Sequence, residues 1–291
     1  MENNLSKCHE VTQRGESTAS PLGDMLLDSS LIITTNEKQL YNVKLINCGD
    51  YVQIYYLERP KIKNEKTNKK QNLKYIDTDN LKKITNNINA NNIEQKNIIR
   101  SKLECQRLAK ANANIWKTFI TLTIAENITD INKANKRFRY FIDKIQRIYK
   151  NFKYICIPEF QKRGAVHYHL LTNICIDDDR FIYKQVGKEK FKHIKYWNDG
   201  FTKVDNLEKD IKKIVGYISK YMTKDIDNRL YNHRRYFYSR NLLKPTINFL
   251  NLNEPKHMKY YLKMLNNKSL IYNNSYINPY NQELIKFNEF L

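Results

Sequence analysis

The chain has 291 residues, of which 41% are hydrophobic and 12% aromatic, so it is large enough to bury one substantial core or two smaller ones. Its 51 Lys and Arg residues exceed the 30 Asp and Glu residues and give a formal net charge of +21, which favours a polyanionic partner, nucleic acid ahead of a membrane surface. The five cysteines are scattered and form no C-x-x-C, which argues against a disulfide framework or a zinc finger, and no apolar run is long enough for a transmembrane helix. We therefore expect a soluble, cytoplasmic protein with no membrane partner.

The N-terminal part is predicted to be an extension. Residues 1–38 are polar and predict disorder. Two strand-like runs, 41–46 and 51–57, are joined by a turn containing Gly49, and this pattern is typical of a β-hairpin. A basic linker follows, and residues 92–114 predict a helix with a basic outer face. Together, 39–114 form one predicted unit.

Residues 116–124 alternate with a period of two and predict a strand. Ile120 and Leu122 face one side, toward a core, whereas Thr121 and Thr123 face the other side. The two threonines are candidates for DNA contact. A helix is predicted next, from Thr129 to about Lys150.

A second hairpin is predicted around a tight turn at Arg163, which is a further candidate for DNA contact. Beyond the turn, His167 and His169 lie two residues apart, so in a strand both project from one face, with Tyr168 on the opposite face. If position 163 is the centre of the hairpin, Glu159 lies directly across from His167. One carboxylate and two imidazoles then converge, and this set predicts a metal site. The alternative is a hydrogen-bonded histidine pair without metal.

Residues 207–223 predict an amphipathic helix whose apolar stripe is bordered by Tyr217 and Tyr221, four residues apart and therefore on one side. Three basic side chains lie just beyond the tyrosines: Lys213, Lys220 and Lys224. A tyrosine at that border can rest over a sheet and still meet an anion. Taken singly, each of the 21 tyrosines is more often a packing residue than a nucleophile.

Residues 229–240 interleave basic and aromatic side chains, and this pattern favours a groove for single-stranded nucleic acid. The candidates for DNA contact are Arg234, Arg235 and Arg240. The alternative is an exposed strand whose arginine stems cover apolar surface. After Pro245 a short helix is predicted over 256–265, within a partly ordered tail formed by 246–291.

These pieces allow phosphodiester chemistry. A divalent metal on the histidine pair polarises a phosphate oxygen, and this makes attack feasible for a tyrosine phenol, which is a poor nucleophile at its free pKa of about 10. The resulting protein–phosphotyrosine bond conserves the energy of the phosphodiester, so strands can be rejoined without ATP. The seven glycines form no G-x-x-x-x-G-K-[ST] phosphate loop, which agrees with chemistry that needs no ATP.

Three motifs in this order resemble those of rolling-circle replication initiators of the HUH endonuclease superfamily, in which U is a bulky hydrophobic residue. Residues 119–123 are similar to the first motif, and Glu159, Arg163-Gly164 and His167-Tyr168-His169 are similar to the metal motif. Residues 216–224 are similar to the catalytic helix of the two-tyrosine replication proteins of small phages and plasmids. The resemblance covers about residues 115–245.

The resemblance implies an α+β fold in which a central antiparallel sheet carries the histidine pair and helices pack on it, preceded by the hairpin extension. It implies Mg²⁺ or Mn²⁺ on His167, His169 and Glu159, and cleavage of single-stranded or extruded origin DNA by Tyr217 or Tyr221, with Lys220 and Lys224 beside them. One tyrosine takes the 5′-phosphate and frees a 3′-OH for a host polymerase, with a host helicase as a further partner in the bacterial cytoplasm.

Two alternatives stay open. A relaxase or single-strand transposase shares this chemistry, although relaxases place the tyrosine before the histidine pair and transposases usually carry one tyrosine. A non-enzymatic, basic nucleic-acid-binding protein explains the charge equally well, but then leaves the two Tyr-x-x-Lys steps as coincidence.

Overall fold

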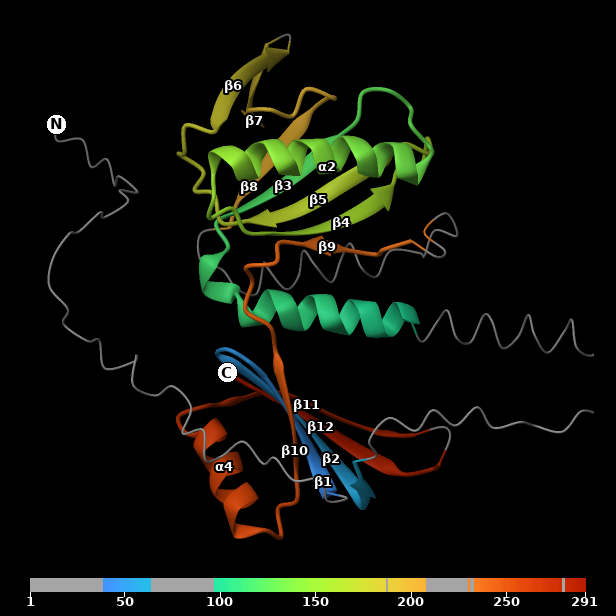
Figure 1. Ribbon diagram of the computed structural model, residues 1–291, viewed down its shortest axis with the longest axis vertical. Helices are drawn as coiled ribbons and strands as arrows, with labels where there is room; N and C mark the ends of the chain where they lie inside the picture. The colour runs from blue at the N-terminus through green and yellow to red at the C-terminus, as the bar shows by residue number, and fades with distance from the viewer. Residues whose placement is uncertain (1–38, 64–96, 187, 208–229, 231–232, 279–280) are drawn as a thin grey trace, which may run out of the picture.

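The computed structural model describes residues 39–63, 97–186, 188–207, 230, 233–278 and 281–291. Two five-stranded sheets lie on either side of a helix that spans 97–111 (Figure 1). We call them the histidine sheet, with strand order β8-β3-β5-β4-β9, and the outer sheet, with strand order β10-β1-β2-β12-β11. The predicted disordered segment 1–38 and the predicted tyrosine helix over 207–223 lie outside the described residues, apart from Leu207 itself.

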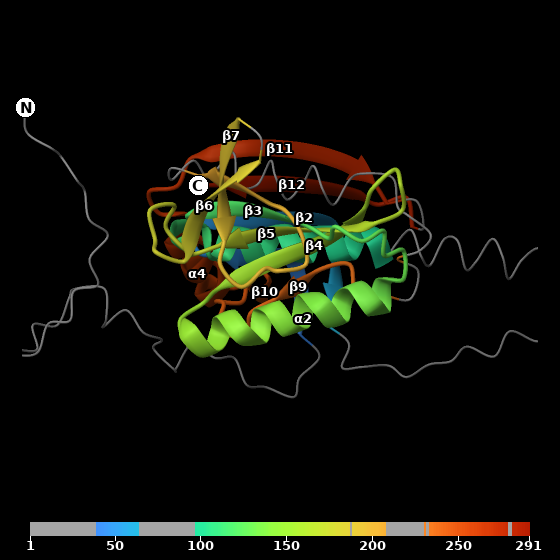
Figure 2. The ribbon, with the colours of Figure 1, turned by 90° about the horizontal axis from the view of Figure 1, so that it is seen from above.

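The histidine sheet is antiparallel throughout. Its strands are β3 (Thr118–Thr123), β4 (Tyr154–Phe160), β5 (Val166–Thr172), β8 (Thr202–Asn206) and β9 (Phe237–Tyr238). Helix α2 (Ile131–Ile148) lies across one face of the sheet, as the view from above shows (Figure 2). The predicted strand and helix over 116–150 are confirmed, and so is the α+β class with helices packed on an antiparallel sheet.

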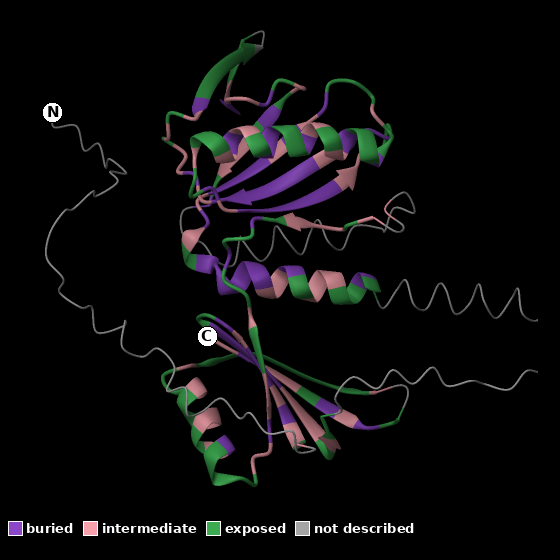
Figure 3. Ribbon diagram, in the orientation of Figure 1, coloured by how far each residue is buried: buried purple, intermediate pink, exposed green. Residues whose placement is uncertain are grey.

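The alternation of each strand sorts its side chains between two cores. Ile120 and Leu122 pack under α2 together with Tyr168, while Phe119 on the opposite face packs with Leu108 of the helix over 97–111. Figure 3 shows the resulting pattern, with buried strands between helices whose outer faces are exposed. The histidine sheet is thus covered by helices on both faces, and its strands read as largely apolar.

Helix α2 begins where a capping side chain supplies acceptors for its first amides. The carboxylate of Asp130 accepts hydrogen bonds from the backbone N–H groups of Asn132 and Lys133. From there, apolar residues at helical spacing turn one side of α2 toward the sheet, including Phe138, Phe141 and Ile145. This packing fixes the sheet face that is turned away from α2, which is the face that carries the histidines.

The outer sheet joins the two ends of the described chain. Its strands are β1 (Leu40–Cys48), β2 (Tyr51–Ile62), β10 (Thr246–Leu250), β11 (Leu270–Ile277) and β12 (Leu284–Phe290). The predicted N-terminal hairpin is confirmed as β1 and β2, and the predicted short helix is confirmed as α4 (Pro255–Leu265). The sequence did not predict that residues 246–291 pair with the hairpin: β10 pairs with β1, and β12 pairs with β2.

Two smaller elements complete the description. A 3₁₀ turn, η2 (Ala113–Ile115), leads from the central helix into β3. A two-stranded ribbon of β6 (Phe181–Val186) and β7 (Glu189–Ile194), which the sequence did not predict, projects from the end of the histidine sheet (Figure 1).

Candidate functional site

The hairpin between β4 and β5 has the predicted register. Glu159 is paired with His167 across the ladder, and Phe160 with Val166. The turn closes when the N–H of Gln161 donates to the carbonyl of Ala165 at 2.8 Å, which leaves three residues at the tip. Gly164 adopts φ 93° there, in the left-handed region that suits glycine. Position 163 is therefore the centre of the hairpin, and the histidine pair and Glu159 share one face.

His169 is held by groups from two neighbouring strands. Its Nε2 lies 2.5 Å from Oε2 of Glu159 on β4, and its Nδ1 lies 3.1 Å from the hydroxyl oxygen of Thr121 on β3. The ring also lies nearly parallel to that of Phe119, with 5.9 Å between the centroids and 13° between the planes. Because an ionised carboxylate only accepts hydrogen bonds, Nε2–H donates to Glu159 and Nδ1 accepts from the Thr121 hydroxyl.

The accessible part of the cluster is His167 and Glu159. The side chain of His169 is 4% exposed, whereas that of Glu159 is 17% exposed, and His167 is half-buried. The two imidazole centroids are 6.0 Å apart. A ligand therefore approaches from the side of His167 and the carboxylate, with the His169 ring behind them.

Tyr168 lies on the opposite face, as predicted. It is fully buried under α2, where its ring stacks on Phe138 with 4.5 Å between centroids and 10° between planes. Its hydroxyl donates to the side-chain oxygen of Asn135 at 2.8 Å. Burial raises the pKa of the Tyr168 phenol far above its ordinary value. This tyrosine anchors the histidine strand to the helix and is no candidate nucleophile.

The donor atoms fit a divalent cation in kind, but they are not spread around a coordination centre. Two imidazoles and one carboxylate on a single sheet face are the ligand types that Mn²⁺ and related ions take. In this structure, however, Nε2 of His169 and Oε2 of Glu159 bond directly to one another. Accordingly, no group of three His, Cys, Asp or Glu side chains in the described part of the chain is arranged as a metal site. Metal binding there requires the carboxylate to separate from the ring.

The other predicted contact residues fall into three places. Arg163 is turned back on its own hairpin, with one nitrogen 3.0 Å from the carbonyl of Ile124 and another 2.8 Å from the Gln161 side chain. Arg234 and Arg240 line a hollow of about 950 Å³ beside α2, so they lie on the α2 side of the sheet rather than with the histidines. Arg235 is half-buried in the same segment.

Thr123 stands opposite His167 in the ladder, as Thr121 stands opposite His169. The remaining candidates lie outside the described residues, and they are Lys213, Tyr217, Lys220, Tyr221 and Lys224. The sequence missed the bond between Thr121 and His169, because the pairing of β3 with β5 was not predicted. The only available signal was that Thr121 lies on the hydroxyl-bearing face of its strand.

Comparison with known proteins gives two similarities. Residues 117–226 match the model of a family of replication-associated proteins, the ORF2 family. The chain is also 29% identical, over 128 residues, to the phasyl DNA replicon protein arp of Escherichia coli. Both similarities point to DNA replication. The second covers 38% of this chain and 44% of the other protein, so the alignment spans less than half of that relative. No solved structure matches the chain.

The family match begins just before β3 and includes the whole histidine hairpin, so the similarity to replication proteins falls on the part of the chain that carries the site. The outer sheet lies outside it. No helix among the described residues is long and apolar enough to cross a membrane.

Proposed function

We propose that this protein initiates rolling-circle replication by nicking single-stranded or extruded origin DNA through tyrosine transesterification, as HUH endonucleases do. The observation that carries the proposal is the convergence of His167, His169 and Glu159 on one face of the hairpin, inside the segment similar to replication proteins. That segment also contains Tyr217 and Tyr221, which supply the nucleophiles in this proposal.

The proposed step exchanges one phosphate ester for another. The phenolic oxygen of Tyr217 or Tyr221 attacks the scissile phosphorus, and the bond from phosphorus to the 3′ oxygen breaks. The phenolic proton is lost to solvent, and the departing oxygen takes up one proton to become a free 3′-OH. The reverse step rejoins the strand without ATP, and the ammonium groups of Lys220 and Lys224 favour the phenolate form of the attacking residue.

The residues that would hold Mg²⁺ or Mn²⁺ are His167, His169 and Glu159. When bound, such an ion polarises the non-bridging phosphate oxygens and neutralises part of the charge that develops in the reaction. The contribution of the protein is to orient the ligands. Thr121 fixes the plane of the His169 ring through Nδ1, so that Nε2 stays directed at the open side of the site.

A nicking assay tests the proposal directly. End-labelled oligonucleotides from the replicon of this protein are incubated with Mn²⁺, and a covalent adduct is sought on a denaturing gel. The double variant Tyr217→Phe/Tyr221→Phe should form no adduct, whereas the control Tyr140→Phe, an exposed tyrosine on α2, should retain it. An adduct that persists in the double variant would show that another residue is the nucleophile.

A second measurement tests the metal site apart from activity. Titration of Mn²⁺ followed by electron paramagnetic resonance should show one bound ion, which is lost in His167→Ala and His169→Ala. These two variants should still bind single-stranded DNA, since the basic surface is unchanged. Unaltered Mn²⁺ binding in both variants would refute the assignment of the ligands.

A non-enzymatic DNA-binding role is the second candidate. It is favoured by the direct contact between Glu159 and His169, which satisfies both groups without a metal. In that case the wild-type protein binds origin DNA and forms no adduct under any metal condition. A relaxase or a single-strand transposase would instead form the adduct, and its DNA ends would be joined to a second molecule rather than extended by a polymerase.

The partners follow from the proposed product. A free 3′-OH on a nicked template is extended by a host DNA polymerase, and displacement of the strand requires a helicase, because the sequence carries no phosphate loop of its own.

A further inference from the structure

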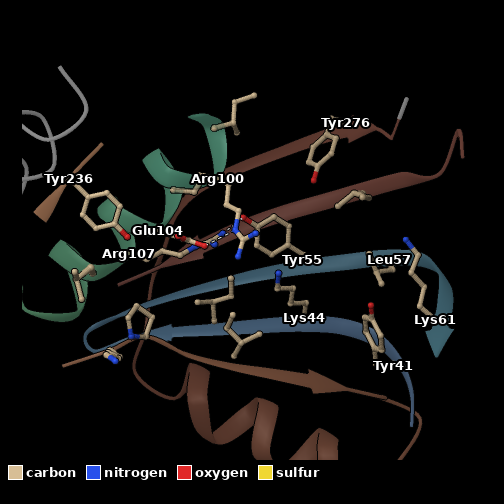
Figure 4. A pocket seen from close by; sticks show the side chains of 18 of the residues that line it. Tyr41, Lys44, Tyr55, Leu57, Lys61, Arg100, Glu104, Arg107, Tyr236 and Tyr276 are labelled. Atoms are coloured by element: carbon tan, nitrogen blue, oxygen red, sulfur yellow. Dashed lines mark hydrogen bonds and ion pairs between the residues drawn. The ribbon is translucent and has the colours of Figure 1, made fainter. Parts of the chain in front are cut away.

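A groove of about 860 Å³ lies between the outer sheet and the helix over 97–111, on the side of that helix away from the histidine sheet. The floor is the face of β1 and β2 that carries Lys44 and Tyr55, and one wall is the helix with Arg107 (Figure 4). The residues after β9 reach the rim through Lys244, next to Tyr238 of β9 itself. No residue of the histidine cluster lines the groove.

The lining combines positive charge with aromatic rings. Five basic residues and one acidic residue contribute to it, together with five tyrosines. The acidic residue, Glu104, is paired with Arg100 at 2.8 Å, and Lys61 is paired with Glu283 at 2.9 Å. None of the ion pairs among the described residues involves Lys44, Arg107 or Lys244, so the groove retains a net positive charge.

Two of these cations are held close to one tyrosine. Nζ of Lys44 lies 5.8 Å from the centre of the Tyr55 ring, and Cζ of Arg107 lies 5.9 Å from it. Arg107 donates to two neutral partners, the Tyr55 hydroxyl at 2.7 Å and the Gln53 side-chain oxygen at 2.8 Å. Burial and the nearby Arg107 charge lower the pKa of Lys44. An anion placed between the two cations relieves their repulsion.

The position of Arg107 is fixed from behind. Lys110, one turn further along the helix, forms a buried ion pair with Glu289 of β12, and Gln53 donates to the same carboxylate at 2.9 Å. The helix is thus bound to the outer sheet by polar contacts as well as by packing. The groove is a built feature of the fold, because its cationic wall cannot turn away without breaking this buried pair.

Exposed aromatic rings line the rim. Tyr276 on β11 is 44% exposed and Tyr238 is 39% exposed. Tyr238 stacks on Tyr236, with 5.7 Å between their centroids and 25° between the planes. Large aromatic side chains left in water beside such cations are typical of surfaces on which unpaired bases stack while the backbone phosphates meet Lys and Arg.

We propose that this groove binds a single strand of DNA, outside the histidine site, with phosphates on Lys44, Arg107 and Lys244 and bases on the tyrosines of the rim. A duplex does not satisfy the lining, since its bases are already stacked and paired. The choice of DNA over RNA rests on the proposed function, whereas the chemistry of the groove specifies a single strand. The volume is in the range of sites that enclose a small molecule, roughly 300–1,000 Å³, so one or two nucleotides are enclosed and the strand continues over the rim.

Fluorescence anisotropy with a labelled oligothymidine tests this proposal on the full chain. The variant Lys44→Ala/Lys244→Ala should weaken binding by about tenfold at low salt and reduce the slope of log K against log salt by about 1.4, since each phosphate contact on a single strand contributes about 0.7. The matched control is Lys256→Ala/Lys259→Ala, which removes two exposed charges from α4 on the other face of the same sheet. Equal slopes for the two double variants would overturn the proposal.

The aromatic part has its own test. Tyr276→Ser should lower the affinity by about fivefold or more without changing the salt slope, because it removes a stacking surface and no charge. Tyr183→Ser, which alters an exposed tyrosine on the distant ribbon, should leave both quantities unchanged. With 5-iodouracil in the oligonucleotide, photo-crosslinks should map to peptides that contain Tyr55, Tyr238 or Tyr276, and crosslinks confined to other peptides would refute the location.

Competition identifies the ligand. Duplex DNA or oligouridine that competes better than oligothymidine, and with the same dependence on Lys44 and Lys244, would contradict single-stranded DNA as the occupant. The result is independent of nicking, because binding is measured and the assay can be run in the Tyr217→Phe/Tyr221→Phe background. If adducts never form but the salt slope changes as predicted, only the nicking proposal is refuted. If adducts form and the slope does not change, only the groove proposal is refuted.

Discussion

Replacing Thr121 with valine removes one hydroxyl from behind the histidine pair and keeps the shape of the side chain. The hydroxyl oxygen lies 3.1 Å from Nδ1 of His169, and it can accept as well as donate a proton. It therefore holds the ring both when Nδ1 is bare, as in the present hydrogen-bond pattern, and when Nδ1 carries the proton because Nε2 is used as a ligand. Valine can do neither.

The expected loss follows from this geometry. Residues that orient a metal-bound histidine typically change metal affinity by about 10- to 100-fold when they are removed, which corresponds to about 1.4–2.7 kcal/mol. The lost hydrogen bond should lower the free energy of unfolding by about 1 kcal/mol, since it is partly buried. Thr121→Val should thus weaken Mn²⁺ binding markedly while the protein remains folded.

The assay is Mn²⁺ titration by electron paramagnetic resonance, with urea unfolding followed by circular dichroism on the same samples. Thr121→Ser restores a hydroxyl and should bind Mn²⁺ within about threefold of wild type, a difference of less than about 1 kcal/mol. The matched control is Thr123→Val, the neighbouring threonine of the same face, which is paired with His167 in the ladder. If Thr121→Val binds Mn²⁺ as tightly as wild type, or Thr123→Val loses as much, the orienting role of Thr121 is wrong.

Three further predictions concern the scaffold. Lys110→Met and Glu289→Leu should each lower the free energy of unfolding by about 3–5 kcal/mol, whereas the double variant should lose less than either, because the single changes each leave a buried charge without its partner; additive losses in urea unfolding would contradict this coupling. Gly200→Ala should destabilise the protein by more than about 2 kcal/mol, since an added Cβ would overlap backbone atoms at the end of β3, and a thermal midpoint equal to that of wild type would refute the close approach. Burial raises the pKa of the Cys48 thiol from 9.0 to about 12, so at pH 8 the folded protein should hold about 1,000-fold less of this thiolate than the unfolded chain; alkylation of Cys48 should be correspondingly slow until urea is added or the pH rises toward 12, and rapid labelling of the folded protein at pH 8 would show that the thiol is accessible.

The face on which each histidine, threonine and tyrosine lies could be read from the sequence by itself. Alternation with a period of two put His167 and His169 on one side of β5 and Tyr168 on the other, because successive side chains of a strand point to opposite faces. The register that pairs Glu159 with His167 was equally local, since a short turn with glycine at its left-handed position fixes which residues face each other. Over these few residues, covalent geometry leaves little choice.

Only the tertiary structure decided which groups bond within the cluster. Glu159 is paired with His167 in the ladder, yet its carboxylate bonds to His169, because side chains on one face also reach their diagonal neighbours. The partner on the other side, Thr121, comes from a strand 48 residues away in the chain. The outer sheet depends on still more distant pairing, of β1 and β2 with strands that follow Pro245. No local pattern encodes such contacts, since they arise from the burial of apolar faces that all the strands share, and the groove beside Arg107 exists only once those faces have met.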